Sequence, residues 1–149
     1  MTRFTVVVES PASPERTWRA VSDWPSHGRW TPLTTVRVLT PSGRGVGARF
    51  VGRTGIGPLA FDDPMEVVEW REPAGGAPGR CRVVKQGRVV LGEACFEVAS
   101  RPPDGSTVTW TEDVEIVPVR LTRHAGWLVA TVGRLAFTRS LQAMTRELR

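Results

Sequence analysis

Between Thr34 and Ile116 the sequence consists almost entirely of short runs rich in β-branched residues, separated by glycine and proline. This pattern predicts neighbouring antiparallel strands joined by short turns, as in a meander. We expect six strands here, within residues 34–40, 47–53, 64–72, 80–86, 88–100 and 106–116. The segment REPAGGAPGR, residues 71–80, lies between two of these runs and is therefore predicted to be a hairpin loop rather than a linker.

The segment before these six strands predicts one more strand and two short helices. Residues 3–10 are rich in β-branched side chains and are followed by Pro11, which predicts a strand. Ser13 can cap a helix that begins at Pro14. Proline and glycine at positions 25 and 28 interrupt this segment, so a second short helix or turn is expected to carry Trp30.

The C-terminal segment has helical rather than strand periodicity. Apolar residues recur at helical spacing and predict one long helix from near Thr122 to Glu147. The stripe expected to face the sheet consists of Trp127, Ala130, Phe137, Leu141, Met144 and Leu148, with Arg134 interrupting it. A second apolar stripe in the first half consists of Leu128, Val132 and Leu135. Seven strands and one long helix with an apolar face predict an α+β domain in which the helix packs on the sheet.

Length and composition narrow the classes of protein. The 149 residues suffice for one domain, which we expect to span 1–149. No apolar run reaches the length of a membrane span, and no signal peptide is recognisable, so we expect a cytoplasmic protein without membrane insertion. The net charge is +5, but the basic residues are scattered singly among acidic ones, which disfavours nucleic-acid binding. The sequence leaves a monomer or a homodimer open.

Four stretches together resemble the START-like helix-grip superfamily, also called SRPBCC, and within it the polyketide cyclase/dehydrase-like group. They are residues 6–30 (VVVESPASPERTWRAVSDWPSHGRW), GRGVGARF, DGSTVTWTEDVEI and the helix that ends RSLQAMTREL. The resemblance covers nearly the whole chain and implies a curved seven-stranded antiparallel sheet wrapped on the C-terminal helix. It also implies a cavity between sheet and helix for lipids, polyketides, hormones or aromatic compounds. No catalytic motif of a subfamily matches residue by residue.

The reactive side chains exclude several chemistries. The chain has no tyrosine, and its two histidines, His27 and His124, lie far apart without a metal-ligand pattern, so we expect neither a metal site nor a cofactor. The two cysteines have no metal or disulfide spacing, and Cys95 lies in a predicted strand without a basic partner nearby. The segment GRGVG leads into a strand and not a helix, so it predicts a turn rather than a phosphate loop.

Strand alternation identifies Glu112 as the unusual carboxylate. It shares one face of the last strand with Val108, Trp110 and Val114, and this apolar face is expected to line the core. A carboxyl group there has a raised pKa and is our candidate general acid or base. Arg134 interrupts the helix stripe that should face this strand, so we hypothesise that Arg134 and Glu112 form one polar spot inside an apolar cavity. The alternative is that both charges reach water at the edges.

These interpretations lead to one set of candidate ligand-binding residues and three candidate functions. The candidate residues are Trp30, Phe50, Trp70, Phe96, Trp110, Glu112, Leu128 and Arg134. Six tryptophans without a tyrosine favour the binding of a hydrophobic, aromatic, polyketide-like or lipid-like small molecule by stacking. A cyclase or dehydrase that uses the pocket carboxylate, and a modulator that binds a protein or the ribosome, are the alternatives. Whether the chain is an enzyme stays open.

Overall fold

The computed structural model describes residues 2–117 and 124–149 and contains one seven-stranded antiparallel sheet with the order β1-β7-β6-β5-β4-β3-β2. The strands are β1 (Thr2–Ser10), β2 (Thr34–Val38), β3 (Arg49–Thr54), β4 (Phe61–Arg71), β5 (Gly79–Gln86), β6 (Val90–Arg101) and β7 (Gly105–Ile116). The helices are α1 (Pro14–Val21), η1 (Trp24–Ser26), α2 (His27–Trp30), η2 (Gly57–Leu59) and α4 (Gly126–Glu147). The predicted α+β class, the helix-grip architecture and the meander are confirmed.

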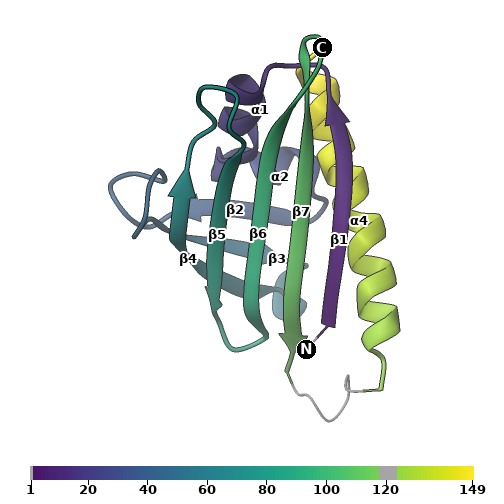
Figure 1. Cartoon of the computed structure of the whole chain (residues 1–149). Helices are drawn as coiled ribbons and strands as arrows, with labels where there is room; N and C mark the ends of the chain where they lie inside the picture. The colour runs from purple at the N-terminus through teal and green to yellow at the C-terminus, as the bar shows by residue number, and fades with distance from the viewer. Residues whose placement is uncertain (1, 118–123) are drawn as a thin grey trace.

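The sheet curls, and the helices lie on its concave side. In Figure 1, β2 and β3 cross behind β5, β6 and β7, while α1, α2 and the yellow α4 lie behind the strands. Helix α4 runs along β1 at one edge of the sheet (Figure 1) and packs mainly against that strand. The concave face and α4 therefore enclose the interior in which a site can form.

The first helix begins where the sequence predicts. Ser13 Oγ accepts a hydrogen bond from the Arg16 backbone N–H at 3.2 Å, and Pro14 occupies the first turn. The long helix begins later than predicted, because residues 124 and 125 are not helical and α4 starts at Gly126. The predicted start near Thr122 lies outside the described residues.

The first half of α4 follows the predicted apolar stripe only in part, because Ala130 packs against the core whereas Trp127 does not. The fully buried residues of α4 are Ser140, Leu141, Met144 and Thr145, all in its last two turns. Arg16 of α1 and Arg29 of α2 hydrogen-bond to Leu148 and Glu147 at this end of the helix. Trp127, predicted to face the sheet, is instead 71% exposed. No described helix is long and apolar enough to cross a membrane.

A bulge in β4 changes which residues point inward. Alternation left the inward face of the strand Met65–Arg71 open, with only a weak preference for Val68 and Trp70, and in the structure the register shifts between Val67 and Glu69. Val67 is fully buried opposite Val83, and Trp70 packs against the core two pairs further along. The extra residue in the bulge breaks the alternation of side chains, so Val67 takes the place expected for Val68.

Candidate functional site

A cavity of about 850 Å³ lies between the concave face of the sheet and the helices. Residues of all seven strands, η1, α2, α4 and the segment after α2 line it. Its size is within the range of small-molecule binding pockets. Most of its lining is apolar or aromatic, so it suits a hydrophobic guest better than a charged one.

Stacked aromatic rings form much of the wall. Trp24 stacks on Phe50 with ring centroids 4.2 Å apart and planes 9° apart. Phe96 stacks on Trp110 at 5.4 Å, and Trp110 stacks on Phe137 of α4 at 5.5 Å. These contacts fix the planes of the rings, so the wall presents preformed flat surfaces to a ligand.

The cavity reaches the molecular surface beside the first half of α4. Leu128 and Val132 both line the cavity, yet they are 46% and 57% exposed. Their exposure explains why the second apolar stripe of the sequence does not become core. The first half of α4 is a wall of the cavity, whereas its last two turns pack into the core.

Three charged side chains lie together inside this apolar enclosure. Lys85 Nζ on β5 is 2.7 Å from Asp63 Oδ2 on β4 and 3.9 Å from Glu112 Oε2 on β7. The exposed fractions of the Lys85 and Glu112 side chains are only 7% and 4%. Glu112 Oε1 accepts a hydrogen bond from Trp110 Nε1 at 2.8 Å. We call Asp63, Lys85 and Glu112 the cavity triad.

Small residues on β6 let the triad form across three strands. Strand β6 lies between β5 and β7, and it places Gly92 opposite Lys85 and Ala94 opposite Glu112. Gly92 has a φ of +118°, and a Cβ there would lie 2.1 Å from the Asp113 carbonyl oxygen. Without a side chain at this position, Lys85 reaches across β6 toward Glu112.

Burial and charge shift the pKa values of the triad. Burial raises the pKa of Glu112, while the Lys85 charge and the Trp110 hydrogen bond offset only part of this rise. Burial disfavours the charged ammonium of Lys85, but the charges of Glu112 and Asp63 outweigh it, so the pKa of Lys85 lies above its ordinary value. The cavity therefore contains a persistent cation beside a carboxyl group that holds its proton to higher pH than usual.

His27 lines the same cavity and is held by the backbone. Its Nε2 lies 2.7 Å from the Val21 carbonyl oxygen. Burial lowers the pKa of His27, although the Val21 hydrogen bond and the Asp23 charge act in the opposite direction. His27 is therefore a neutral ring at neutral pH, and the hydrogen bond to Val21 places the proton on Nε2.

The structure brings most of the predicted site residues to the cavity. The lining includes Trp30, Phe50, Phe96, Trp110, Glu112 and Leu128. Trp70 is not part of the lining; its ring packs edge-on against Trp18 with centroids 5.1 Å apart, and Arg44 lies over it at 5.5 Å. Ligand binding by these residues stays a prediction.

The structure does not bring Arg134 to Glu112. Arg134 is exposed and is not part of the cavity lining, although Ala130 and Phe137 on the same predicted stripe pack against the core. The cation near Glu112 is Lys85, which our interpretation of the sequence missed. The signal was available, since alternation along β5 places the chain's only lysine on the same face as Cys81 and Val83.

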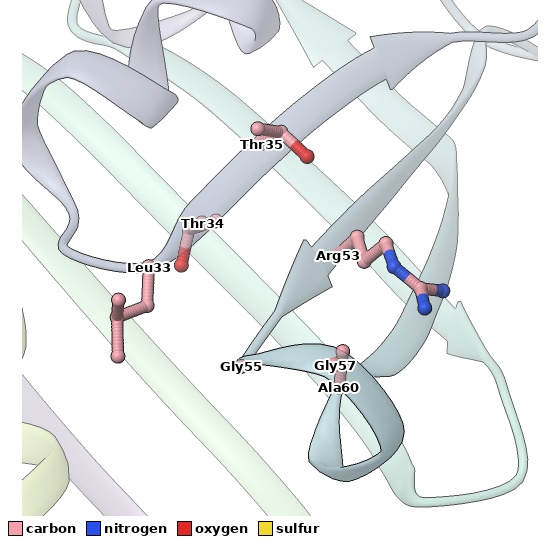
Figure 2. Close-up of a pocket in the computed structure, with 7 residues that line it drawn as sticks. All are labelled: Leu33, Thr34, Thr35, Arg53, Gly55, Gly57 and Ala60. Atoms are coloured by element: carbon pink, nitrogen blue, oxygen red, sulfur yellow. The ribbon is translucent and has the colours of Figure 1, made fainter.

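A second hollow of about 560 Å³ lies on the other side of β2 and β3 (Figure 2). Its lining consists of Leu33, Thr34, Thr35, Arg53, Gly55, Gly57 and Ala60. Arg53 is the one charged residue in this lining, and its Nη1 is already paired with Asp62 Oδ1 at 3.0 Å. The hollow therefore offers a ligand little polar recognition, and the larger cavity is the candidate site.

Comparisons with known proteins agree with this geometry. The family described as "Polyketide cyclase / dehydrase and lipid transport" matches residues 1–149. No curated protein matches the sequence. A protein from Thermus thermophilus is 18% identical with a TM-score of 0.75, covering 97% of this chain and 94% of its own.

Two further solved structures share the fold. A START superfamily protein from Mycobacterium smegmatis is 22% identical with a TM-score of 0.69, and the match covers 100% of both chains. Norcoclaurine synthase from Thalictrum flavum, solved with dopamine and hydroxybenzaldehyde, is 14% identical with a TM-score of 0.63. That match covers 99% of this chain and 87% of the synthase. At such identities the likeness establishes the fold alone.

Proposed function

Because the chain belongs to the polyketide cyclase / dehydrase and lipid transport family, we propose that it binds a hydrophobic, aromatic or polyketide-like small molecule in the cavity between sheet and α4. The observation that carries this proposal is the aromatic-walled cavity of about 850 Å³. Transfer of a ligand's apolar surface from water into such an enclosure contributes about 25 cal/mol per Å² of buried surface to the free energy of binding.

The ring geometry favours aromatic ligands over unbranched chains. Trp110 is held between Phe96 and Phe137, and Trp24 lies flat against Phe50, so both ring systems are rigid before a ligand arrives. A rigid, flat ligand loses little conformational entropy on stacking against such walls, whereas a fatty acid must freeze many rotatable bonds.

Tryptophan fluorescence tests the proposal. We expect polycyclic aromatics and flavonoids to change the emission on titration at micromolar concentrations, and fatty acids of similar size to act more weakly. The Trp110→Phe variant should lose much of the change, because Trp110 lines the cavity. Trp70→Phe is the matched control, because Trp70 lies outside the lining. No response to any compound, or equal loss in both variants, would contradict the proposal.

The cavity triad favours a second candidate function, an acid–base enzyme of the cyclase or dehydrase type. A carboxyl group with a raised pKa next to a retained ammonium can supply and remove protons at higher pH than an ordinary carboxyl group. Incubation with polyketide-like β-hydroxy ketones, which can lose an α proton and the hydroxyl group as water, followed by mass spectrometry for that loss, tests this candidate. Turnover that vanishes in Glu112→Gln while binding persists would favour the enzyme over a carrier. Unchanged compounds throughout the panel would favour the carrier.

A further inference from the structure

The cavity triad leaves hydrogen-bonding groups unused inside the cavity. Lys85 Nζ carries three N–H donors, and its contacts in the described structure are Asp63 Oδ2 at 2.7 Å and the weak acceptor Met65 Sδ at 3.6 Å. Glu112 Oε2 stands 3.9 Å from Lys85 Nζ, too far for a hydrogen bond. Asp63 Oδ1 is buried and accepts no hydrogen bond from any described residue.

We propose that the triad recognises a neutral hydroxyl group on the aromatic ligand, which accepts a hydrogen bond from Lys85 and donates one to Glu112. This inference rests on the proposed function and names the polar end of its ligand. An oxygen about 2.8 Å from both Lys85 Nζ and Glu112 Oε2 would form a triangle on the 3.9 Å separation with an angle of roughly 90° at the oxygen. A hydroxyl oxygen can serve both partners in this geometry.

The charges of the triad select against other polar groups. A ligand carboxylate would face two acidic residues, Asp63 and Glu112, around a single cation. A ligand ammonium would face the charge of Lys85 at close range. A hydroxyl group adds no charge and both donates and accepts, so it fits whether Glu112 is protonated or ionised.

The triad also lies next to the aromatic wall. Trp110 stacks in the wall and donates its Nε1–H to Glu112, so the carboxyl group is held at the edge of the ring stack. A ring that stacks along this wall places its substituent toward the triad. The inferred ligand class is therefore a hydroxylated aromatic compound, such as a phenol or a naphthol.

Four naphthalenes of similar size test the inference by calorimetry with the full chain. They are naphthalene, 2-naphthol, naphthalene-2-carboxylate and 2-naphthylmethylammonium. A purely apolar cavity binds naphthalene more tightly than 2-naphthol, because the hydroxyl group must lose its water. With hydrogen bonds to the triad we expect 2-naphthol to bind about tenfold or more tighter than naphthalene. Both charged compounds should bind more weakly than 2-naphthol.

Substitutions of Lys85 and Glu112 test whether the triad causes the preference for 2-naphthol over naphthalene. Lys85→Met should abolish the preference for 2-naphthol while naphthalene still binds. Arg82→Met is the matched control, because Arg82 lies on the same strand but pairs with Glu93 at 3.0 Å outside the cavity. If Lys85→Met fails to fold, Glu112→Met keeps the Lys85–Asp63 pair intact and should reduce the preference several-fold.

The outcomes separate the two proposals. If naphthalene and 2-naphthol bind equally, or if naphthalene or a charged compound binds most tightly, the hydroxyl inference is wrong and the proposed function stands. The inference is also wrong if the preference survives in both Lys85→Met and Glu112→Met. If none of the four compounds binds, both proposals are wrong.

Discussion

Gly52 offers a test in which stability and ligand binding should change in opposite directions. It lies on β3 and lines the cavity, its φ is not in the left-handed region, and the nearest atom to a Cβ built there is Met65 Cε at 4.0 Å. A phenylalanine at this position would therefore project its ring into the cavity without a clash. Val51→Phe is the matched control, because Val51 is the next residue on β3 and does not line the cavity.

The magnitudes follow from burial. Removing a glycine from a strand and partly burying a phenyl ring should raise the free energy of unfolding of Gly52→Phe by about 0.5–2 kcal/mol. For a chain of this length this corresponds to an increase in Tm of about 1–8 °C. A ligand that needs the same space must displace the ring, which costs about 1.5–3 kcal/mol of its burial. We therefore expect Kd for an aromatic ligand to rise about ten- to a hundredfold.

Thermal denaturation and calorimetry on both variants measure the two effects. Val51→Phe should bind as the parent chain does. Unchanged affinity in Gly52→Phe would show that the ligand does not use this part of the cavity. A fall in Tm of several degrees would show that the space at Gly52 does not admit a ring, and the reasoning from the cavity volume would fail.

Three further predictions concern the triad and the core. Burial raises the pKa of Glu112 above its ordinary value of 4.5, so the folded state binds the extra proton and stability falls as pH rises from 4.5 through the folded pKa. Glu112→Gln should remove this fall in the free energy of unfolding, which is at most about 1.4 kcal/mol per pH unit. Identical pH profiles of Tm for the parent chain and the variant would contradict this prediction. A Cβ at Gly79 would lie 2.6 Å from Pro73 Cδ and 2.7 Å from Trp18 Cε3. Gly79→Ala should therefore lower the free energy of unfolding, measured by urea titration, by about 1–3 kcal/mol. An unchanged urea midpoint would show that the Trp18 ring moves aside without cost. Burial raises the pKa of Cys81 to about 12. Iodoacetamide near pH 8 should therefore alkylate Cys81 about a thousandfold more slowly in the native chain than in the unfolded chain. Equal alkylation rates, measured by mass spectrometry, would contradict the burial of Cys81.

The sheet could be predicted from the sequence because side chains alternate between the two faces along each strand, and a short stretch of sequence shows this alternation. Period-2 alternation placed Trp110, Glu112 and Val114 on the concave face, and the structure has all three lining the cavity. The same rule left the inward face of β4 open, and a β-bulge there adds one residue without a distinctive sequence signal. It would have identified Lys85, since the residues that alternate with it along β5 are apolar.

The helix could be predicted less well, because its periodicity says which residues share a face but not what covers that face. Leu141 and Arg134 lie on one predicted stripe, yet Leu141 is buried and Arg134 is exposed. Ala130 and Phe137 on the same stripe pack against the core, so tertiary contacts cover part of this face and leave Arg134 uncovered. Which part of a stripe becomes core depends on tertiary contacts that the helix's own sequence does not encode.

Stability alone does not account for the cavity triad. Lys85 and Glu112 together lose most of their hydration, and the 3.9 Å between their charged atoms is too long for a hydrogen bond to compensate that loss. Most neighbouring positions on the concave face are apolar, so apolar residues in place of the whole triad would pack without this penalty, whereas replacing one member alone leaves another buried charge without its partner. The strand between them has Gly92 and Ala94 where larger residues would keep the two charges apart. A costly charge pair, with small residues giving it room in an aromatic-walled cavity, is the arrangement expected when polar groups are positioned for a ligand.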